Sequence, residues 1–123
     1  LQQSDISPIL SSARALVLPS LRECGGAVVL EAMASSVAVI STNWGGPTDY
    51  LDSDCGLLVD PDSRSALVTG FSRAMIQLAE HPEIAEQMGS LGRKKVEAEF
   101  DWERKVDQVM YHYKQLVNTY RKQ

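Results

Sequence analysis

Two glutamates, Glu23 and Glu31, flank a pair of glycines at the expected start of a helix. Gly25 and Gly26 allow backbone conformations that other residues disfavour, and they allow a ligand to approach the main chain closely. The helix expected to follow offers unpaired N–H groups and the positive end of its dipole, which favour an anion such as phosphate. Carboxylates accept hydrogen bonds from hydroxyl groups, so Glu23 and Glu31 could hold hydroxyls on either side of that anion. This arrangement suits a sugar nucleotide, in which a ribose, a diphosphate and a hexose follow one another.

Composition and charge favour a single globular domain and exclude several partner classes. The chain has 123 residues and a net charge of −4. A mildly acidic chain has no field that would gather nucleic acid or an anionic membrane. Its basic clusters, residues 93–95 and 121–122, lie in mixed-charge sequence typical of solvated helix faces. We therefore expect no nucleic-acid partner.

Cysteine usage and hydropathy point to the cytoplasm. The two cysteines, Cys24 and Cys55, are too few for a disulfide framework or a zinc set. No apolar run approaches the roughly 20 residues of a membrane span. We expect a cytoplasmic protein, with a peripheral membrane association left open for a longer polypeptide.

Hydrophobic patterning predicts strands that alternate with helices. Continuous apolar runs, typical of strands covered on both faces, predict strands at residues 15–19, 37–41 and 56–59. Helices are predicted at residues 4–13, 27–35, 47–51, 63–80 and 83–98, and from an N-cap at Asp101 to about Tyr120. This alternation indicates an α/β fold with a parallel sheet.

The two glycine turns each follow a predicted strand. Gly25 and Gly26 come after the first strand, and Gly45 and Gly46 come after the second. In parallel α/β sheets, ligands bind in the loops at the carboxyl ends of the strands. Both turns should therefore lie at the same edge of one sheet, which is stronger evidence for a site than either motif alone.

The small number of strands predicts part of a larger domain. The first strand should have a second neighbour, for which this chain offers no candidate. We therefore expect residues 1–123 to form the C-terminal half of a Rossmann-like domain with a helix-rich C-terminus. The start at Leu1, rather than Met, suits a piece of a longer polypeptide. An uncovered apolar edge strand is adhesive, so the isolated chain is expected to self-associate through this edge or to aggregate.

The ordered motifs resemble the donor domain of retaining GT-B glycosyltransferases of the family-4 type, the glycosyl transferases group 1. The resemblance covers roughly residues 5–121. It rests on Pro19-Ser20, Glu23, Glu31-Ala32-Met33-Ala34, Gly45-Gly46 and Gly56-Leu57-Leu58-Val59-Asp60-Pro61. The paired glutamates are a weak signal by themselves because glutamate is common, whereas the full ordered set is specific.

The resemblance implies a role for each site residue. Glu23 would be the catalytic residue that contacts the donor hexose, and Glu31 would bind the ribose. Sugar and diphosphate would be held by Cys24, Gly25, Gly26, Ala27, Gly45 and Gly46. The family transfers a hexose from a nucleoside-diphosphate sugar with retention of configuration, and it needs neither a metal in the site nor a cofactor.

The resemblance also implies that parts of the enzyme lie upstream of Leu1. These are the basic side chains of the same domain and an N-terminal acceptor-binding domain, so the fragment alone is expected to be inactive. Phe100, Trp102 and Val106 are predicted to dock the last helix. In the family that helix crosses back to the N-terminal domain, so part of its apolar face would be an interdomain surface.

The sequence departs from the family pattern at a few positions. The first glycine motif reads Glu23-Cys24-Gly25-Gly26, whereas in the family the residue after the first Glu-Gly unit is commonly aromatic, as in Glu-Gly-Phe-Gly. Asp49 replaces the glutamate that usually follows the second glycine motif. Ser36 stands where a glycine commonly ends the helix, which removes the easiest residue for a left-handed cap. We expect the change at Ser36 to affect stability more than chemistry.

Other interpretations remain open at this point. The chain could be a nucleotide-sugar-binding subunit that acts with a separate partner chain, or a non-catalytic module kept for interaction. Glu23 could be an exposed loop acid, Glu31 an exposed helix residue, and the glycines only a tight turn. A dinucleotide oxidoreductase is disfavoured, since no Gly-x-Gly-x-x-Gly motif follows a strand.

Overall fold

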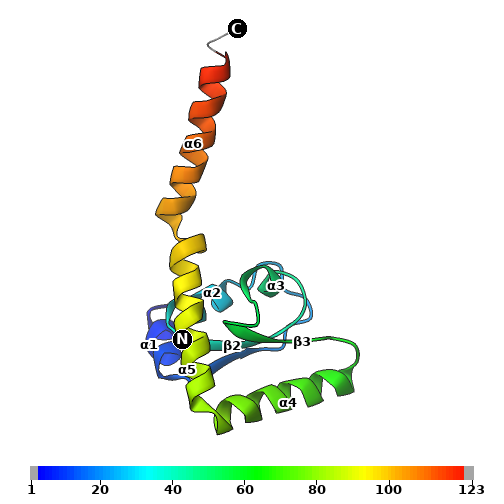
Figure 1. Cartoon of the computed structure of the whole chain (residues 1–123). Helices are drawn as coiled ribbons and strands as arrows, with labels where there is room; N and C mark the ends of the chain where they lie inside the picture. Colours follow the sequence, from blue (N-terminus) through cyan, green and yellow to red (C-terminus); the bar gives the residue numbers. More distant parts are fainter. Residues whose placement is uncertain (1–2, 121–123) are drawn as a thin grey trace.

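Three parallel strands form the centre of the computed structural model, which describes residues 3–120 (Figure 1). The strands are β1 (Ala15–Leu18), β2 (Ala38–Thr42) and β3 (Gly56–Val59), in the spatial order β1-β2-β3. Leu16 of β1 lies opposite Val39 of β2, which in turn lies opposite Gly56 of β3. The three predicted strands and their parallel arrangement are confirmed, with boundaries that shift by one residue at most.

Helices account for most of the remaining chain. They are α1 (Gln3–Ser12), α2 (Ala27–Ala34), α3 (Pro47–Tyr50), α4 (Arg64–Glu80), α5 (Pro82–Lys95), the π-helix η1 (Val96–Phe100) and α6 (Trp102–Tyr120). Side chains cap two of them. Ser63 Oγ accepts a hydrogen bond of 3.1 Å from Ala66 N at the start of α4. Asp101 Oδ1 accepts one of 2.9 Å from Glu103 N at the start of α6, which confirms the predicted N-cap.

Two apolar layers cover the two faces of the sheet. Successive side chains of a strand point to opposite faces, and the residues of β2 alternate between the layers accordingly. Val39 packs with α1 and α2 in one layer, whereas Ala38 and Ile40 pack with α4 and α5 in the other. All five residues of β2 are buried, which explains why its sequence is a nearly continuous apolar run.

The turn between α2 and β2 contains the residue that departs from the family pattern. Ser36 has φ +58°, so it adopts the left-handed conformation for which glycine is the easiest choice. Helix α5 packs directly against this turn, since a Cβ on Gly89 would overlap the Ser36 carbonyl oxygen. The tertiary contact thus holds Ser36 in a conformation that costs an L-residue about 1 kcal/mol.

Helix α6 projects away from the sheet and does not dock on it (Figure 1). Trp102 is 81% exposed and Val106 is 53% exposed, so the predicted docking stripe is wrong for both. Phe100 is the exception, because its ring packs edge-on against Tyr50 with 5.3 Å between centroids. Helices of the earlier chain already cover both faces of the sheet, so α6 has no apolar face of this domain to bury.

The outer edge of β1 is open within residues 3–120, where β2 is its one strand neighbour. Val17 of this strand is 37% exposed. That β1 has a second neighbour in a larger domain, and that the isolated chain self-associates through this edge, both stay predictions. No helix in the described part of the chain combines the length and apolar character that crossing a membrane requires.

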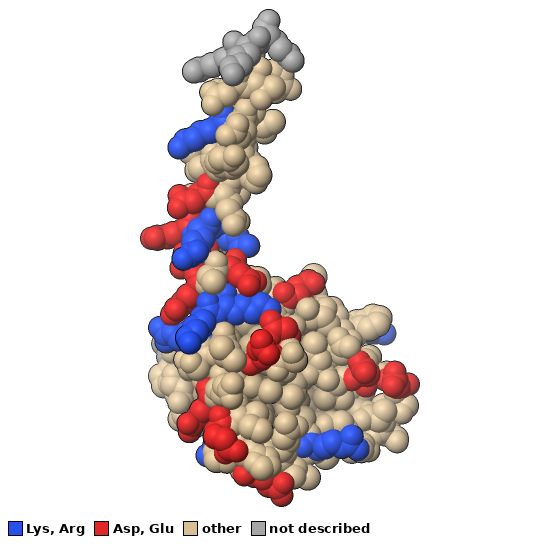
Figure 2. Space-filling view, viewed as in Figure 1, with Lys and Arg blue, Asp and Glu red and all other residues tan. Residues whose placement is uncertain are grey.

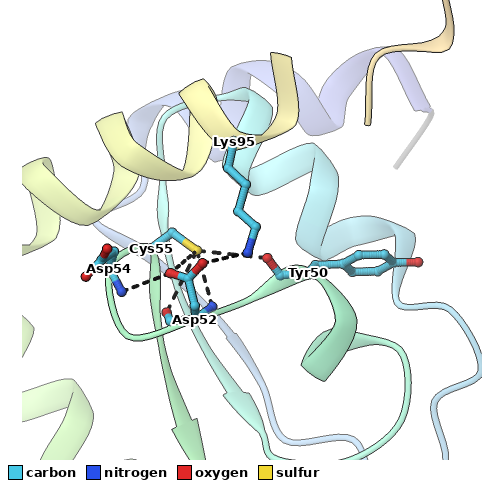
Figure 3. A network of polar contacts seen from close by, with 5 residues as sticks. All are labelled: Tyr50, Asp52, Asp54, Cys55 and Lys95. Carbon is cyan, nitrogen blue, oxygen red and sulfur yellow. Dashed lines mark hydrogen bonds and ion pairs between the residues drawn. The ribbon is translucent and has the colours of Figure 1, made fainter. Parts of the chain in front are cut away.

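A polar network ties the last turn of α5 to the loop before β3 (Figure 3). Lys95 Nζ donates to Asp52 Oδ2 over 2.6 Å, while Asp52 Oδ1 accepts from Asp54 N at 3.0 Å and from Cys55 Sγ at 3.3 Å. The hydrogen bond from Lys95 lowers the pKa of Asp52, and the carboxylate raises the pKa of Lys95. Burial raises the pKa of the Cys55 thiol, which favours the neutral donor.

Candidate functional site

The two glycine turns meet at the carboxyl edge of the sheet, as the sequence predicts. We call residues 19–26, after β1, the Glu23 loop, and residues 43–47, after β2, the Gly45 turn. A Cβ on Gly46 would lie 2.5 Å from the Gly25 carbonyl oxygen, and one on Gly45 would overlap the Glu23 carbonyl oxygen. The backbones of the two segments are therefore in direct contact, at the edge where α/β sheets bind ligands.

Glu23 lies at the N-terminus of α2. Its Oε1 accepts a hydrogen bond of 3.0 Å from the backbone N–H of Gly26, the residue that precedes the helix. Gly26 has φ +61°, a left-handed conformation that glycine adopts readily. The carboxylate is thus held beside the positive end of the helix dipole by an amide that the sequence predicts to bind the donor.

The predicted sugar- and diphosphate-binding residues differ in accessibility. Cys24, Ala27 and Gly45 are exposed and Gly25 is partly exposed, whereas Gly26 and Gly46 are buried. The N-cap residue of α2, Gly26, has no side chain with which to cap the helix, and its backbone N–H donates to the Glu23 carboxylate. Ala27, the first residue of the helix, is exposed, so the helix start is open to an anion beside Glu23.

Glu31 is exposed on the second turn of α2, farther from the helix start than Glu23. It borders a cleft of about 290 Å³ between α1 and α2, which is lined by Ile6, Ser7, Leu10, Glu31, Ala34 and Ser35. A diphosphate at the start of α2 would have Glu23 beside it and Glu31 about a turn farther along the helix, since each residue rises about 1.5 Å. Ser7 also lines this cleft, and no sequence motif singles it out.

The ends of β2 and β3 carry further polar groups. Asn43 Nδ2 donates to Asp60 Oδ1 over 2.6 Å, which joins the two strand ends. Thr42 is fully buried, and within the described chain its hydroxyl oxygen has no hydrogen-bond partner. Pro47 is also fully buried beneath the Glu23 loop, although its sequence pattern indicates only a helix start. Asn43 and Asp60 each directly follow a strand, and this position in the sequence is the signal that could have linked them.

Charged side chains of both signs lie on the surface near the C-terminal end of α5. Figure 2 shows Lys and Arg side chains where α5 meets η1, interspersed with Asp and Glu, and Arg93, Lys94 and Lys95 form the last turn of α5. Arg93 Nε pairs with Glu97 Oε1 at 2.8 Å. Within residues 3–120, no cluster of three or more His, Cys, Asp or Glu side chains has the geometry of a metal site.

Comparison with known proteins identifies similar chains. The family model described as glycosyl transferases group 1 matches residues 1–95. Alpha-maltose-1-phosphate synthase of Mycolicibacterium smegmatis is 35% identical over 114 residues, which cover 90% of this chain and 30% of that protein. A putative teichuronic acid biosynthesis glycosyltransferase of Bacillus subtilis, TuaC, is 31% identical over 89% of this chain and 27% of its own length. The chain thus spans about 30% of the length of the curated relatives it matches.

Solved structures share the same architecture. Sucrose-phosphate synthase from Thermosynechococcus elongatus superposes with a TM-score of 0.80 at 31% identity, over 97% of this chain and 29% of that one. TarM superposes with a TM-score of 0.71 at 21% identity, over 85% of this chain and 20% of that one, a likeness of fold alone. The α/β fold class with a parallel sheet and a helix-rich C-terminus is confirmed.

Proposed function

The chain belongs to the glycosyl transferases group 1 family, and from this premise we propose that it binds the nucleoside-diphosphate sugar of a GT-B enzyme that transfers a hexose with retention of configuration. The observation that carries the proposal is the position of the Glu23 carboxylate. It lies 3.0 Å from the Gly26 amide, beside the start of α2 and at the carboxyl edge of the sheet. A hydroxyl-binding group and an anion-binding helix end are therefore neighbours there.

In the proposed complex the donor diphosphate lies at the N-terminus of α2. The backbone of Cys24, Gly25 and Ala27 faces the sugar and the phosphates, while Glu23 accepts hydrogen bonds from hexose hydroxyls. Glu31 binds the ribose hydroxyls from the exposed side of α2. The leaving nucleoside diphosphate gains negative charge as the glycosidic bond breaks, and fixed N–H dipoles stabilise that charge without reorganising. This arrangement needs no metal ion or cofactor.

The names of the relatives support a nucleotide-sugar donor. One similar protein, from Corynebacterium glutamicum, is named a GDP-mannose-dependent mannosyltransferase and is 32% identical over 84% of this chain. Others are named alpha-maltose-1-phosphate synthase and D-inositol 3-phosphate glycosyltransferase. We propose that this chain shares the donor class, a nucleoside-diphosphate hexose, while a separate acceptor domain of a longer cytoplasmic polypeptide selects the acceptor.

The apolar face of α6 supports a second domain. Eight residues at helical spacing form one stripe of this helix, and each is at least 46% exposed: Trp102, Val106, Val109, Met110, Tyr113, Leu116, Val117 and Tyr120. A stripe of this width is typical of a helix that packs on a folded surface. We propose that the acceptor domain covers it in the longer polypeptide.

The test is a donor assay on the longest polypeptide that contains this chain. Release of nucleoside diphosphate is measured from a panel of UDP-, GDP- and ADP-hexoses, and the anomeric configuration of the product is read by NMR. Glu23→Ala should abolish transfer, and Glu31→Ala should raise the donor KM. Glu80→Ala, which removes an exposed glutamate at the end of α4, is the matched control and should behave as wild type.

Other outcomes would favour the alternative functions. Donor binding without turnover, in the presence of any acceptor tried, would favour a nucleotide-sugar-binding subunit that needs a partner chain. Failure of every donor to bind would favour a non-catalytic module. Turnover that neither glutamate substitution changes would remove Glu23 and Glu31 from the site.

A further inference from the structure

We propose that Gly45, Gly46 and Pro47 are positioning residues: they form a rigid seat beneath the Glu23 loop that holds the Glu23 carboxylate in place. In this arrangement the Gly45 turn acts through Glu23 and the Gly26 amide, and it is not itself a ligand of the donor. The catalytic consequence rests on the function proposed above, whereas the seat itself is a property of the fold.

The two glycines of the turn lie against backbone atoms of the Glu23 loop. Gly45 has φ +66°, and a Cβ at this position would overlap the carbonyl oxygen of Glu23. A Cβ on Gly46 would lie 2.5 Å from the carbonyl oxygen of Gly25 and 2.7 Å from its carbon. Backbone atoms cannot rotate away as a flexible side chain can, so any side chain here would displace the Glu23 loop.

Pro47 completes the seat from the next position in the chain. It is fully buried, and its ring carbons lie 3.2 and 3.3 Å from the position that a Cβ on Gly26 would occupy. Gly26 is therefore enclosed between the Pro47 ring and the Glu23 side chain, whose Cγ is 3.3 Å from the same position. The residue that donates to the Glu23 carboxylate is thus fixed by the Gly45 turn.

Hydrogen bonds tie the two glycines of the seat to α3. Thr48 Oγ1 donates to Gly45 O over 2.8 Å, and the backbone N–H of Thr48 donates to the same oxygen over 3.1 Å. Asp49 N donates to Gly46 O over 3.0 Å. Both glycine carbonyls are therefore engaged by α3, which anchors the seat to the fold.

Burial separates this role from donor binding. Gly46 and Pro47 are buried in the structure, so neither offers a surface to a ligand. Gly45 is exposed, and its positioning role rests on its contact with the Glu23 carbonyl oxygen. Gly25, by contrast, has open space where a Cβ would stand, since no heavy atom lies within 4 Å of that position. Contacts with the backbone of the chain itself thus require glycine at positions 45 and 46. No contact within the described structure requires glycine at position 25.

The test follows the Gly26 amide by NMR in the chain itself, without a donor. Because this N–H donates to the Glu23 carboxylate, its proton resonance should lie downfield, and Glu23→Ala should move it upfield. Gly45→Ala and Gly46→Ala should likewise remove the downfield shift, whereas Gly25→Ala should retain it. Gly89→Ala, which crowds the Ser36 carbonyl instead, controls for general destabilisation and should also retain it.

A second variant keeps the test decisive if Gly45→Ala fails to fold. Position 45 lies between Cys24 and Cys55, so a synthetic segment 24–54 can be ligated at both cysteines. D-alanine at position 45 suits a positive φ and places its methyl group at the other hydrogen of the Cα. It should restore the Gly26 signature, and failure to do so in a folded chain would overturn the contact with Glu23.

Donor binding and turnover separate the seat from the proposed function. In a polypeptide with transfer activity, Gly46→Ala should lower kcat by about 100-fold, as a misplaced catalytic group does, with little change in donor KM. An unchanged Gly26 signature together with a raised KM would mean that the turn binds the donor, and would overturn the proposal. If the signature changes but UDP, GDP and ADP bind to no variant and not to wild type, the seat stands and the proposed function fails.

Discussion

Lys95 Nζ lies 2.6 Å from Asp52 Oδ2, although 43 residues separate the two in the chain. The pair joins the end of α5 to the loop that leads into β3, and it reaches the buried thiol of Cys55 through the same carboxylate. Side chains of α5 thereby fix the entry of an edge strand of the sheet (Figure 3).

This network predicts how stability depends on pH. The pKa of Asp52 is lowered in the fold, so its contribution is present above the ordinary value of about 3.9 and is lost as pH falls below it. The pKa of Lys95 is raised, so its contribution is present below about 10.4 and is lost as pH rises through the higher value of the folded state.

We expect Lys95→Met to lower the free energy of unfolding at pH 7 by about 1 kcal/mol or less, because the Asp52 side chain is 49% exposed and screened by solvent. Urea unfolding at pH 3, 7 and 11 measures the effect, which should be largest at pH 7. Lys94→Met, at the exposed neighbouring position, is the control. Equal losses at all three pH values would contradict an electrostatic role.

Ser36→Gly should stabilise the protein. Ser36 holds φ +58°, which costs an L-residue about 1 kcal/mol, and glycine adopts this conformation without that cost. The gain should be slightly smaller than this value, since glycine loses more entropy on folding. Thermal unfolding of both chains measures it, and a lower melting temperature for Ser36→Gly would show that the serine makes a compensating contact.

Met33→Ala should be severely destabilising. Met33 is fully buried between α2 and the sheet, where it packs with Val29 and Val39. Truncation of a buried methionine costs about 2–5 kcal/mol, depending on how far the cavity collapses. Denaturant unfolding gives the value. Met75→Ala on α4, where the side chain is 44% exposed, is the matched control and should cost well under half as much.

Removal of α6 should leave the rest of the domain folded. No residue of this helix is buried in the described chain, and its main contacts are with η1. A chain that ends at Asp101 should therefore melt within about 3 °C of the parent chain, since a change of 1 kcal/mol shifts the melting temperature of a domain this size by about 4–8 °C. It should also aggregate less, because the exposed apolar stripe is gone. A large fall in melting temperature would show that α6 docks on the domain in solution.

Glu31→Gln provides a milder test of the proposed ribose-binding role of Glu31 than truncation. Glutamine keeps the shape of the side chain but loses the charge, and a hydrogen bond to a charged group contributes about 1.5–3 kcal/mol. In an active polypeptide we expect donor KM to rise by about tenfold or more, with kcat little changed, as for a group that binds ground state and transition state alike. A fall in kcat with unchanged KM would place Glu31 nearer to the chemistry.

Local signals in the sequence were sufficient for the elements and for the edge of the sheet at which the two glycine turns meet. Asp101 and Ser63 start helices because their short side chains accept backbone N–H groups, which depends on no distant residue. Apolar runs bounded by proline and glycine predict β1, β2 and β3, because a parallel strand is buried on both faces. The meeting of the two glycine turns followed from the order of strands alone.

Tertiary structure alone decided what those residues touch. The sequence assigns Gly45 and Gly46 to a ligand, whereas the fold presses them against Glu23 and Gly25, since backbone contacts between distant loops leave no periodicity to read. The ion pair of Lys95 with Asp52 could not be predicted from the sequence either, because it joins residues far apart in the chain. The amphipathic pattern of α6 can be recognised in the sequence, but a stripe of apolar residues does not specify the surface on which the helix packs. Whether such a face is buried depends on which surfaces of the domain remain uncovered, and in this fold α1, α2, α4 and α5 already occupy them.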